Sequence, residues 1–181
     1  MATFDPNKYH RRSIRLPGYD YTTPGAYFVT MFTRFRECMF GIIAGGEMGL
    51  SEYGVIARDE LLRSSESRRN ITIDKCVIMP DHVHAIITIL DSKGTARRAL
   101  TEGFGQPITG SLPTIVRSYK SAVAKKINES RKTPGEPVWH RNYYEHVIRD
   151  ESEMEAIIAY IEANPSKWDE DNEPLRDNSE Q

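Results

Sequence analysis

A turn followed directly by two histidines and a short apolar run constrains this chain more than any other feature. Pro80-Asp81 is a typical turn dipeptide, and the β-branched segment 85–90 that follows the histidines predicts a buried strand. Side chains alternate between the two faces of a strand, so His82 and His84 share one face and Val83 takes the other. Two imidazoles on one face provide half of a metal site, and the other ligands must come from elsewhere in the chain.

The histidine pair also has a simpler explanation, in which both rings are packed and hydrogen-bonded inside the sheet. A single His-X-His tripeptide is a weak signal for a metal site. The pattern of the strand favours the metal interpretation, because its odd-numbered positions are wholly apolar and suit a face covered by helices. These positions are Val83, Ala85, Ile87 and Ile89. The even-numbered face begins with the two histidines, so one end of it is available for chemistry.

The composition is that of a soluble single domain. With 181 residues, 39% of them hydrophobic and 28% charged, the chain can bury a core without disulfides. No apolar run approaches the ~20 residues of a membrane span, and the N-terminus lacks the apolar segment of a secretory signal. Cys38 and Cys76 lie in apolar, strand-like stretches without metal-ligand spacing, which predicts buried thiols in a reducing compartment. We therefore expect a cytoplasmic protein that does not contact a membrane.

The net charge of −2 conceals a separation of charge along the chain. Residues 1–36 hold six basic residues against two acidic ones, and residues 117–149 hold eight against three. Residues 150–181 hold two basic residues against eleven acidic ones. The two basic segments suit a phosphate-binding surface, but solvated helix faces give the same pattern. Charge alone does not decide between them.

Strand and helix signals alternate along the rest of the chain. Strand patterns cover residues 26–32, 71–79, 82–90 and 144–148, and residues 39–50 fit a hairpin that turns at Gly45-Gly46. Helical spacing covers residues 52–64 after an N-cap at Ser51, residues 111–130, and residues 152–163, where Pro165 is expected to end the helix. This order predicts an α+β fold with a ferredoxin-like antiparallel sheet and helices packed on it.

The same pattern divides the chain into three parts. We expect a basic N-terminal arm at residues 1–23, a folded domain at residues 24–168 and an acidic, disordered tail at residues 169–181. A Gly-, Ser- and Thr-rich stretch at residues 91–110 reads as a long loop inside the domain.

The last predicted helix carries a tyrosine and an amide one turn apart. Its core stripe is Met154, Ile157, Ile158 and Ile161. Tyr160 and Asn164 lie on an edge of that stripe. From spacing alone, such a pair is more often a packed aromatic ring and a helix C-cap than a functional site, because no motif rule singles it out.

Four short motifs lie in order along the chain. They read PGAYF at residues 24–28, MPDHVH at 79–84, WHRNYYEHVIR at 139–149 and YIEANP at 160–165. Each motif is weak alone, but together, in this order and spacing, they resemble the HUH transposases that use a single catalytic tyrosine. The sequence is most similar to their REP-associated tyrosine transposase branch. The resemblance extends from about residue 25 to residue 168.

The resemblance implies a metal-dependent transposase that cuts and rejoins single-stranded DNA near hairpin repeats. His82 and His84 match the family's metal-binding pair for Mg²⁺ or Mn²⁺, and Asn164 occupies the place of a third, amide ligand. Imidazole ligands favour manganese in affinity, whereas cellular abundance favours magnesium. Tyr160 matches the nucleophile carried by the C-terminal helix. Attack by its oxygen on the DNA would form a 5′-phosphotyrosine and release a 3′-hydroxyl. The reaction would need no ATP.

A DNA substrate gives the basic segments an expected role. We predict that basic side chains from the arm, the helix at 111–130 and the third motif contact DNA phosphates. They are Arg11, Arg12, Arg15, Arg117, Lys120, Lys125, Lys126 and Arg141. His10, in the same arm, is expected to contact phosphate as well.

The remaining histidines and tyrosines of the motifs have competing roles. His140 and His146 are expected to be structural or to contact DNA, with a metal or acid–base role as the alternative. Tyr143 and Tyr144 stand beside an apolar strand and match aromatic packing positions of the family, so Tyr160 is preferred as the nucleophile.

Two alternative functions can be compared with the transposase by the residues that each one requires. A hairpin-binding protein without catalysis would not require His82, His84 and Tyr160 together. A two-histidine phosphoesterase would require a second His-X-Thr or His-X-Ser motif, which this chain lacks. The sequence does not specify the hairpin, the cleavage position, or whether the element is mobile or domesticated. It also leaves monomer and homodimer open, because insertion-sequence relatives are dimers whereas the REP-associated branch is compatible with monomers.

Overall fold

A computed structural model describes residues 19–91 and 110–172 of the chain. The elements are β1 (Gly25–Phe32), β2 (Gly41–Ala44), β3 (Glu47–Leu50), α1 (Glu52–Glu66), β4 (Ile71–Ile78), β5 (His82–Ile89), α2 (Leu112–Ser130), β6 (Tyr144–Ile148) and α3 (Glu151–Asn172), with a short 3-10 turn at Arg34–Arg36. None of the helices in these ranges is long and apolar enough to cross a bilayer. Most of the predicted arm, the loop predicted at 91–110 and the end of the tail lie outside the described residues.

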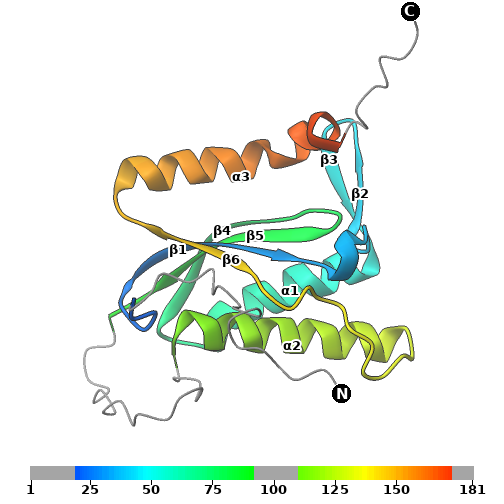
Figure 1. Ribbon diagram of the computed structural model, residues 1–181, viewed down its shortest axis with the longest axis horizontal. Coiled ribbons are helices and arrows are strands. Elements are labelled where there is room, and N and C mark those ends of the chain that lie inside the picture. The colour runs from blue at the N-terminus through cyan, green and yellow to red at the C-terminus, as the bar shows by residue number, and fades with distance from the viewer. Residues whose placement is uncertain (1–18, 92–109, 173–181) are drawn as a thin grey trace, which may run out of the picture.

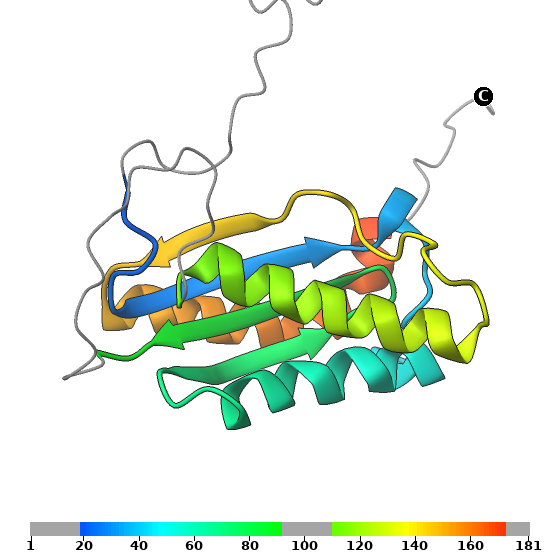
Figure 2. The same ribbon diagram turned by 90° about the horizontal axis from the view of Figure 1, so that it is seen from below.

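Four antiparallel strands form the main sheet in the order β4-β5-β1-β6. Helices α1 and α2 lie on one face of this sheet and α3 lies on the other (Figure 1; Figure 2 shows α1 and α2 in front of the sheet). The predicted α+β fold with an antiparallel sheet and packed helices is therefore confirmed. The hairpin of β2 and β3 stands apart from the main sheet and turns at Gly45-Gly46, as expected.

The predicted alternation of β5 is also confirmed. Its odd-numbered side chains are buried in the main core between the sheet and helices α1 and α2. On α2, the expected apolar stripe joins the same core, and its buried members are Ile115, Val116, Tyr119, Val123 and Ile127. The even-numbered face of β5 therefore points to the opposite side, toward α3.

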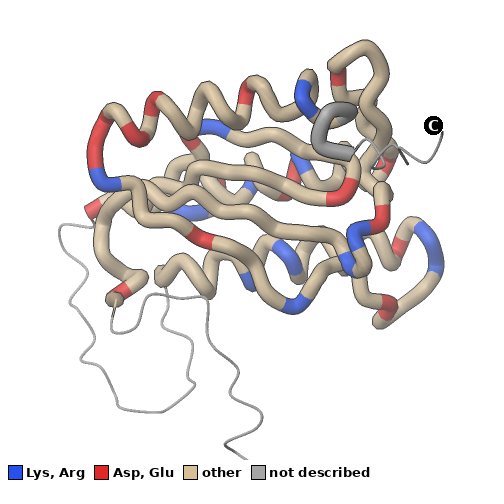
Figure 3. The backbone as a smooth tube through the Cα atoms, turned by 45° about the horizontal axis from the view of Figure 1, so that its top comes forward, with Lys and Arg blue, Asp and Glu red and all other residues tan. Residues whose placement is uncertain are grey.

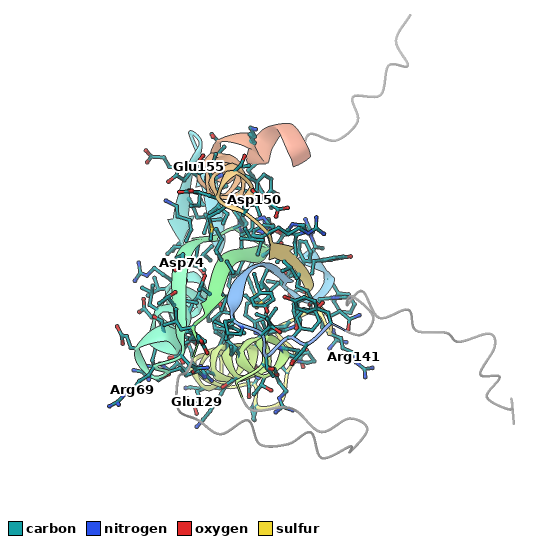
Figure 4. The ribbon with its side chains drawn as sticks, turned by 90° about the vertical axis from the view of Figure 1, so that its left-hand side faces the viewer. Arg69, Asp74, Glu129, Arg141, Asp150 and Glu155 are labelled. Carbon is teal, nitrogen blue, oxygen red and sulfur yellow. The ribbon has the colours of Figure 1, made fainter. Side chains whose placement is uncertain are left out.

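The sequence predicts that the histidine end of the even-numbered face of β5 is available for chemistry, which implies an open sheet face, and the structure corrects this expectation. Helix α3 packs against β4 and the β2–β3 hairpin, so it covers part of that face. Figure 4 shows α3 end-on above the β4–β5 side of the sheet, while the β1–β6 side is less covered. His82 and His84 are accordingly buried, with relative exposures of 6% and 4%.

Pro165 does not end the last helix, contrary to the prediction. A proline inside a helix removes one backbone donor and crowds the preceding turn, so the helix usually bends there. Here α3 continues to Asn172, and Figure 4 shows its last turns running across the axis of the earlier ones. Tertiary contacts support the continuation, because Trp168 packs on His82 and the backbone of Ser166 lies next to the hairpin glycine Gly46. The segment predicted as a disordered tail from residue 169 thus begins as helix.

The two cysteines are less buried than predicted. Cys38 is exposed, because the apolar residues around it form a link between the 3-10 turn and β2 and not a core strand. Cys76 lies on β4 and is partly buried against the core. Both are free thiols.

Gly54, in the first turn of α1, fits against the chain that precedes the hairpin. A Cβ at this position would lie 2.0 Å from the carbonyl oxygen of Phe40, which accepts the backbone N–H of Ser51. Gly54→Ala would normally stabilise a helix by about 1 kcal/mol. Here the clash should outweigh that gain and lower the free energy of unfolding by roughly 1–2 kcal/mol. Chemical denaturation measures the sign, and a stabilised variant would contradict this packing.

Candidate active site

The two predicted histidines converge on one point. The Nε2 atoms of His82 and His84 are 3.0 Å apart, and the two rings meet edge to face. At that distance the nitrogens either share a proton or bind a common cation, because two bare lone pairs repel each other. Two ligands held at about 2.1 Å and at right angles around one ion are also about 3.0 Å apart.

The opposite nitrogen of each ring has its own partner. His82 donates from Nδ1 to Asp81 Oδ1 at 2.6 Å, and His84 Nδ1 is 2.8 Å from the Thr30 hydroxyl. Arg36 donates from Nε to the second oxygen of Asp81 at 2.5 Å. Histidines that bind metals typically use one ring nitrogen for the ion and orient the other through such a hydrogen bond. The pair is therefore oriented with both Nε2 atoms inward.

The electrostatics keep His84 neutral and Asp81 charged. Burial, with a smaller effect from His82, lowers the pKa of His84 to about 3. Burial alone would raise the pKa of Asp81, but its hydrogen bond to His82 and the nearby Arg36 hold it below its usual value. A neutral imidazole offers a lone pair, and a charged carboxylate fixes the proton of its partner on Nδ1.

Helix α3 places two side chains, Tyr160 and Trp168, against the histidines. The hydroxyl of Tyr160 is 3.5 Å from His84 Nε2, and two turns later the ring of Trp168 lies 5.9 Å from that of His82. Asn164 lies between them on the same helix face and is half-buried. Tyr160 remains 48% exposed, so its hydroxyl is accessible from outside. The structure thus brings Tyr160 together with His82 and His84, and it places Asn164 one helical turn after Tyr160 and one turn before Trp168.

The donor set fits a divalent cation. Within the described residues, no cluster of three or more His, Cys, Asp or Glu side chains is placed to hold a metal ion. A third ligand from the described part of the chain would therefore be a neutral group, and Asn164 is a candidate because it follows Tyr160 by one turn of α3. Two imidazoles and one amide leave coordination positions open, which is the arrangement of a catalytic site and not of a closed structural one.

The predicted DNA contacts on α2 are separated from this site by the sheet. Figure 3 shows basic positions along α2 in the layer opposite the largely acidic α3. Lys120 donates to the carbonyls of residues 140, 141 and 142, at 2.6, 3.4 and 3.3 Å, and burial lowers its pKa to about 8. Lys126 is 2.5 Å from the buried carboxylate of Glu60. Two of the four lysines and arginines predicted on α2 therefore serve the fold.

The other predicted DNA contacts differ in their surroundings. Arg117 and Lys125 are exposed on α2, where Lys125 forms a surface ion pair with Glu129 at 3.8 Å. Arg141 is exposed in the loop before β6, and Figure 4 shows it projecting away from α3. The residues predicted in the arm, Arg11, Arg12 and Arg15, lie outside the described residues, as does His10.

The remaining histidines and tyrosines of the third motif differ in their surroundings: His140 is exposed, His146 forms an ion pair and Tyr143 is buried. His146 donates from Nε2 to Glu153 Oε1 at 2.6 Å, and the other oxygen of Glu153 accepts the backbone N–H of Arg149, just before α3. Tyr143 belongs to the core, as expected. Tyr144, expected to pack, is 57% exposed and touches the ring of Phe32 edge to face.

The sequence pattern does not predict the roles of three further residues of the site. Asp81 was assigned only a turn role, although its position directly before His82 is a usable signal for an orienting carboxylate. Thr30 depends on the register of β1 against β5, which the sequence does not give. Trp168 was unexpected because Pro165 seemed to end the helix before it.

Comparison with known proteins supports the resemblance found in the motifs. An uncharacterised protein of Haemophilus influenzae is 38% identical over 168 residues, covering 90% of this chain and 92% of the relative. A second protein of that organism, named "Putative REP-associated tyrosine transposase", is 26% identical over 148 residues, covering 82% of this chain and 74% of the relative. No protein-family model matches the chain.

The fold has a counterpart among solved structures. A REP-associated tyrosine transposase bound to a REP hairpin superposes with a TM-score of 0.54 at 17% identity, covering 85% of this chain and 74% of the other. At that identity the likeness concerns the fold. Like the match to the uncharacterised relative, the structural match extends over most of the chain.

Proposed function

We propose that the chain is a REP-associated tyrosine transposase of the HUH type and that it nicks and rejoins single-stranded DNA beside hairpin repeats. One observation carries the proposal: the Tyr160 hydroxyl lies 3.5 Å from His84 Nε2, which is itself 3.0 Å from His82 Nε2. A nucleophile and a pair of ligands from two distant parts of the chain meet at one point.

In this proposal His82, His84 and Asn164 hold Mg²⁺ or Mn²⁺, which supplies Lewis-acid stabilisation of charge on the phosphate when bound. The chain itself orients the ligands, because Asp81 and Thr30 fix the rings from their outer sides. Helix α3 fixes the tyrosine, whose ring packs edge to face on Phe28 at 6.0 Å. Holding the reacting groups in place removes much of the entropic cost of the reaction.

The reaction is a transesterification. The Tyr160 oxygen attacks the phosphorus of a DNA phosphodiester, forming a tyrosine–phosphorus bond as the bond to the 3′-oxygen breaks. The released 3′-oxygen takes up a proton, and the phenol proton passes to solvent at the exposed side of the tyrosine. In the reverse step a 3′-hydroxyl attacks the same phosphorus and displaces Tyr160. The bond energy is kept throughout, so no nucleotide cofactor is needed.

The DNA substrate is proposed from the family and from the fold neighbour, which is bound to a REP hairpin. The hairpin itself would dock on exposed basic side chains, and the adjoining single strand would enter from the less covered β1–β6 side. One chain supplies both the histidines and the tyrosine, so a homodimer is not required to complete the site.

The experiment that tests the function is detection of a covalent adduct. Full-length protein is incubated with a labelled DNA hairpin that has single-stranded flanks, in Mn²⁺, and then denatured. The proposal expects a denaturation-resistant protein–DNA complex and a free 3′-hydroxyl product, with the attached peptide containing Tyr160. Hairpin binding without any adduct would favour the alternative, a non-catalytic hairpin-binding protein derived from a transposase.

The basic residues should separate into DNA contacts and structural groups. Arg117→Gln with Arg141→Gln removes two exposed charges, so the slope of log affinity against log salt should fall by about one unit per lost phosphate contact. Lys120→Met should instead lower the melting temperature, because its ammonium bonds three carbonyls of one loop. Fluorescence anisotropy across a salt series measures the first effect. An unchanged slope in the double variant would remove these arginines from the interface.

A further inference from the structure

The turn after β1 combines a strained backbone with an exposed aromatic ring. Phe35 has φ 57° and ψ 17°, and Arg36 has φ 59°, so two bulky residues occupy the left-handed region. That region disfavours every residue except glycine, and asparagine or aspartate less strongly. The Phe35 side chain is nevertheless 76% exposed. Burial of the ring in the core therefore does little to offset the backbone strain.

The strain is imposed by the residues around the turn. Thr33 donates from its backbone N–H to the carbonyl of Asp81 at 2.8 Å, and its hydroxyl lies 3.0 Å from the same oxygen. Arg34 donates from its backbone N–H to the carbonyl of Val138 at 2.9 Å. Strain that is fixed in this way and presents an exposed side chain is characteristic of a ligand-binding position.

The turn lies beside the histidine pair. Arg36 pairs with Asp81, the carboxylate that orients His82, and its guanidinium lies 4.1 Å from the centre of the Phe32 ring. Phe32 in turn is 5.4 Å from the ring of His82. On the other flank, the guanidinium of Arg34 lies 4.7 Å from the centre of the Phe35 ring. Phe35 thus carries one arginine on its ring and directly precedes the arginine that pairs with the orienting carboxylate of the candidate active site.

Two further exposed aromatic side chains contact the end of β1 and the histidine pair. Among the exposed large hydrophobic residues of the described ranges, the aromatic ones are Phe35, Tyr144 and Tyr160. Tyr144 touches Phe32, and Tyr160 touches His84. A few separate aromatic rings among cations do not form the continuous apolar patch of a protein–protein interface. They match the stacking surfaces and cationic flanks that bind unpaired nucleic-acid bases.

We propose that Phe35 is a stacking platform for an unpaired base of the DNA strand that enters the site, with Arg34 and Arg36 beside the adjoining phosphates. The identity of the strand rests on the proposed function, but the base-binding property is tested separately from catalysis. One face of the ring faces Arg34, and the high exposure leaves surface for a base.

The test uses Phe35→Gly, which removes the ring and suits the left-handed backbone. Full-length protein carrying Tyr160→Phe, which cannot form an adduct, is titrated with a labelled oligothymidylate of about ten nucleotides. Phe35→Gly should weaken binding about tenfold, the typical loss of one base–aromatic stack. Its melting temperature should stay unchanged or rise by about 2–4 °C as the strain is relieved. Phe35→Trp should retain affinity, whereas Phe35→Leu should lose it, because leucine has no π-face.

Leu62→Ala is the matched control, since Leu62 is 44% exposed on α1, on the far side of the sheet. It should leave oligothymidylate binding unchanged. Unchanged affinity in Phe35→Gly, an equal loss in Leu62→Ala, or full affinity in Phe35→Leu would each overturn the inference. The two proposals can fail separately. If the protein with Tyr160 intact forms no adduct but still needs Phe35 to bind the oligonucleotide, the proposed catalysis is wrong and the proposed base-stacking role of Phe35 is retained.

Discussion

Tyr160→Phe should abolish the covalent protein–DNA adduct, with a loss of at least about 10³-fold in its rate of formation, because the substitution removes the attacking oxygen. The fold should survive, since the Tyr160 ring keeps its contacts with Phe28 and His84, and the bond that the hydroxyl makes among the described residues is long, 3.5 Å to His84. Binding to a DNA hairpin should therefore change little. Gel analysis after denaturation measures the adduct, and anisotropy measures binding.

Two other tyrosines provide matched controls. Tyr144→Phe alters an exposed ring on the neighbouring strand β6, and Tyr143→Phe alters a ring in the core. Both variants should still form the adduct. The assignment fails if the Tyr160→Phe protein yields a denaturation-resistant adduct, and Tyr144 would then be the next candidate because its hydroxyl is accessible.

The elements that carry this site were predictable because their signals are local. The turn at Pro80-Asp81 and the alternation of β5 are properties of a few adjacent residues, and both were confirmed. The same holds for the N-cap of α1, where the Ser51 hydroxyl accepts the backbone N–H of Gly54 as the sequence suggested. Short-range patterns of this kind depend on backbone geometry and burial, which composition and spacing express directly.

The errors came from tertiary contacts. Pro165 has the local signature of a helix end, but packing of Trp168 and Ser166 on distant residues continues the helix past it. Lys120 looks like a surface cation on a helical stripe, yet its chain reaches a loop twenty residues later in the sequence and binds three of its carbonyls. A charge pattern cannot distinguish a lysine exposed on the surface from one that binds backbone carbonyls, because both lie off the apolar stripe.

The orienting residues of the site illustrate the same limit. Thr30 reaches His84 only because β1 pairs with β5 in one register, and Arg36 reaches Asp81 only through the left-handed turn. Neither relation can be read from residue spacing. Asp81 is the exception, since a carboxylate next to a histidine of a His-X-His pair is visible in the sequence.

Replacing both histidines by alanine should abolish specific binding of Mn²⁺ and, with it, adduct formation. The proposed site has two imidazole ligands, and their removal leaves only the amide of Asn164. In the wild-type protein, Mn²⁺ at one hundred times its dissociation constant should stabilise the folded state by about 2.7 kcal/mol. For a chain of this size that corresponds to a rise in melting temperature of roughly 5–10 °C.

The double variant His82→Ala/His84→Ala should show no such rise, whereas His146→Ala should retain it, because His146 pairs with Glu153 and does not touch the converging rings. Asp81→Ala should have an intermediate effect. It leaves both Nε2 atoms in place but frees the His82 ring to rotate, and loss of such an orienting partner weakens metal binding by about 10- to 100-fold. Thermal denaturation and titration calorimetry with Mn²⁺ give these affinities without reference to DNA. If Mn²⁺ does not change the melting temperature of the wild-type protein, the two nitrogens 3.0 Å apart share a hydrogen bond and do not form a metal site.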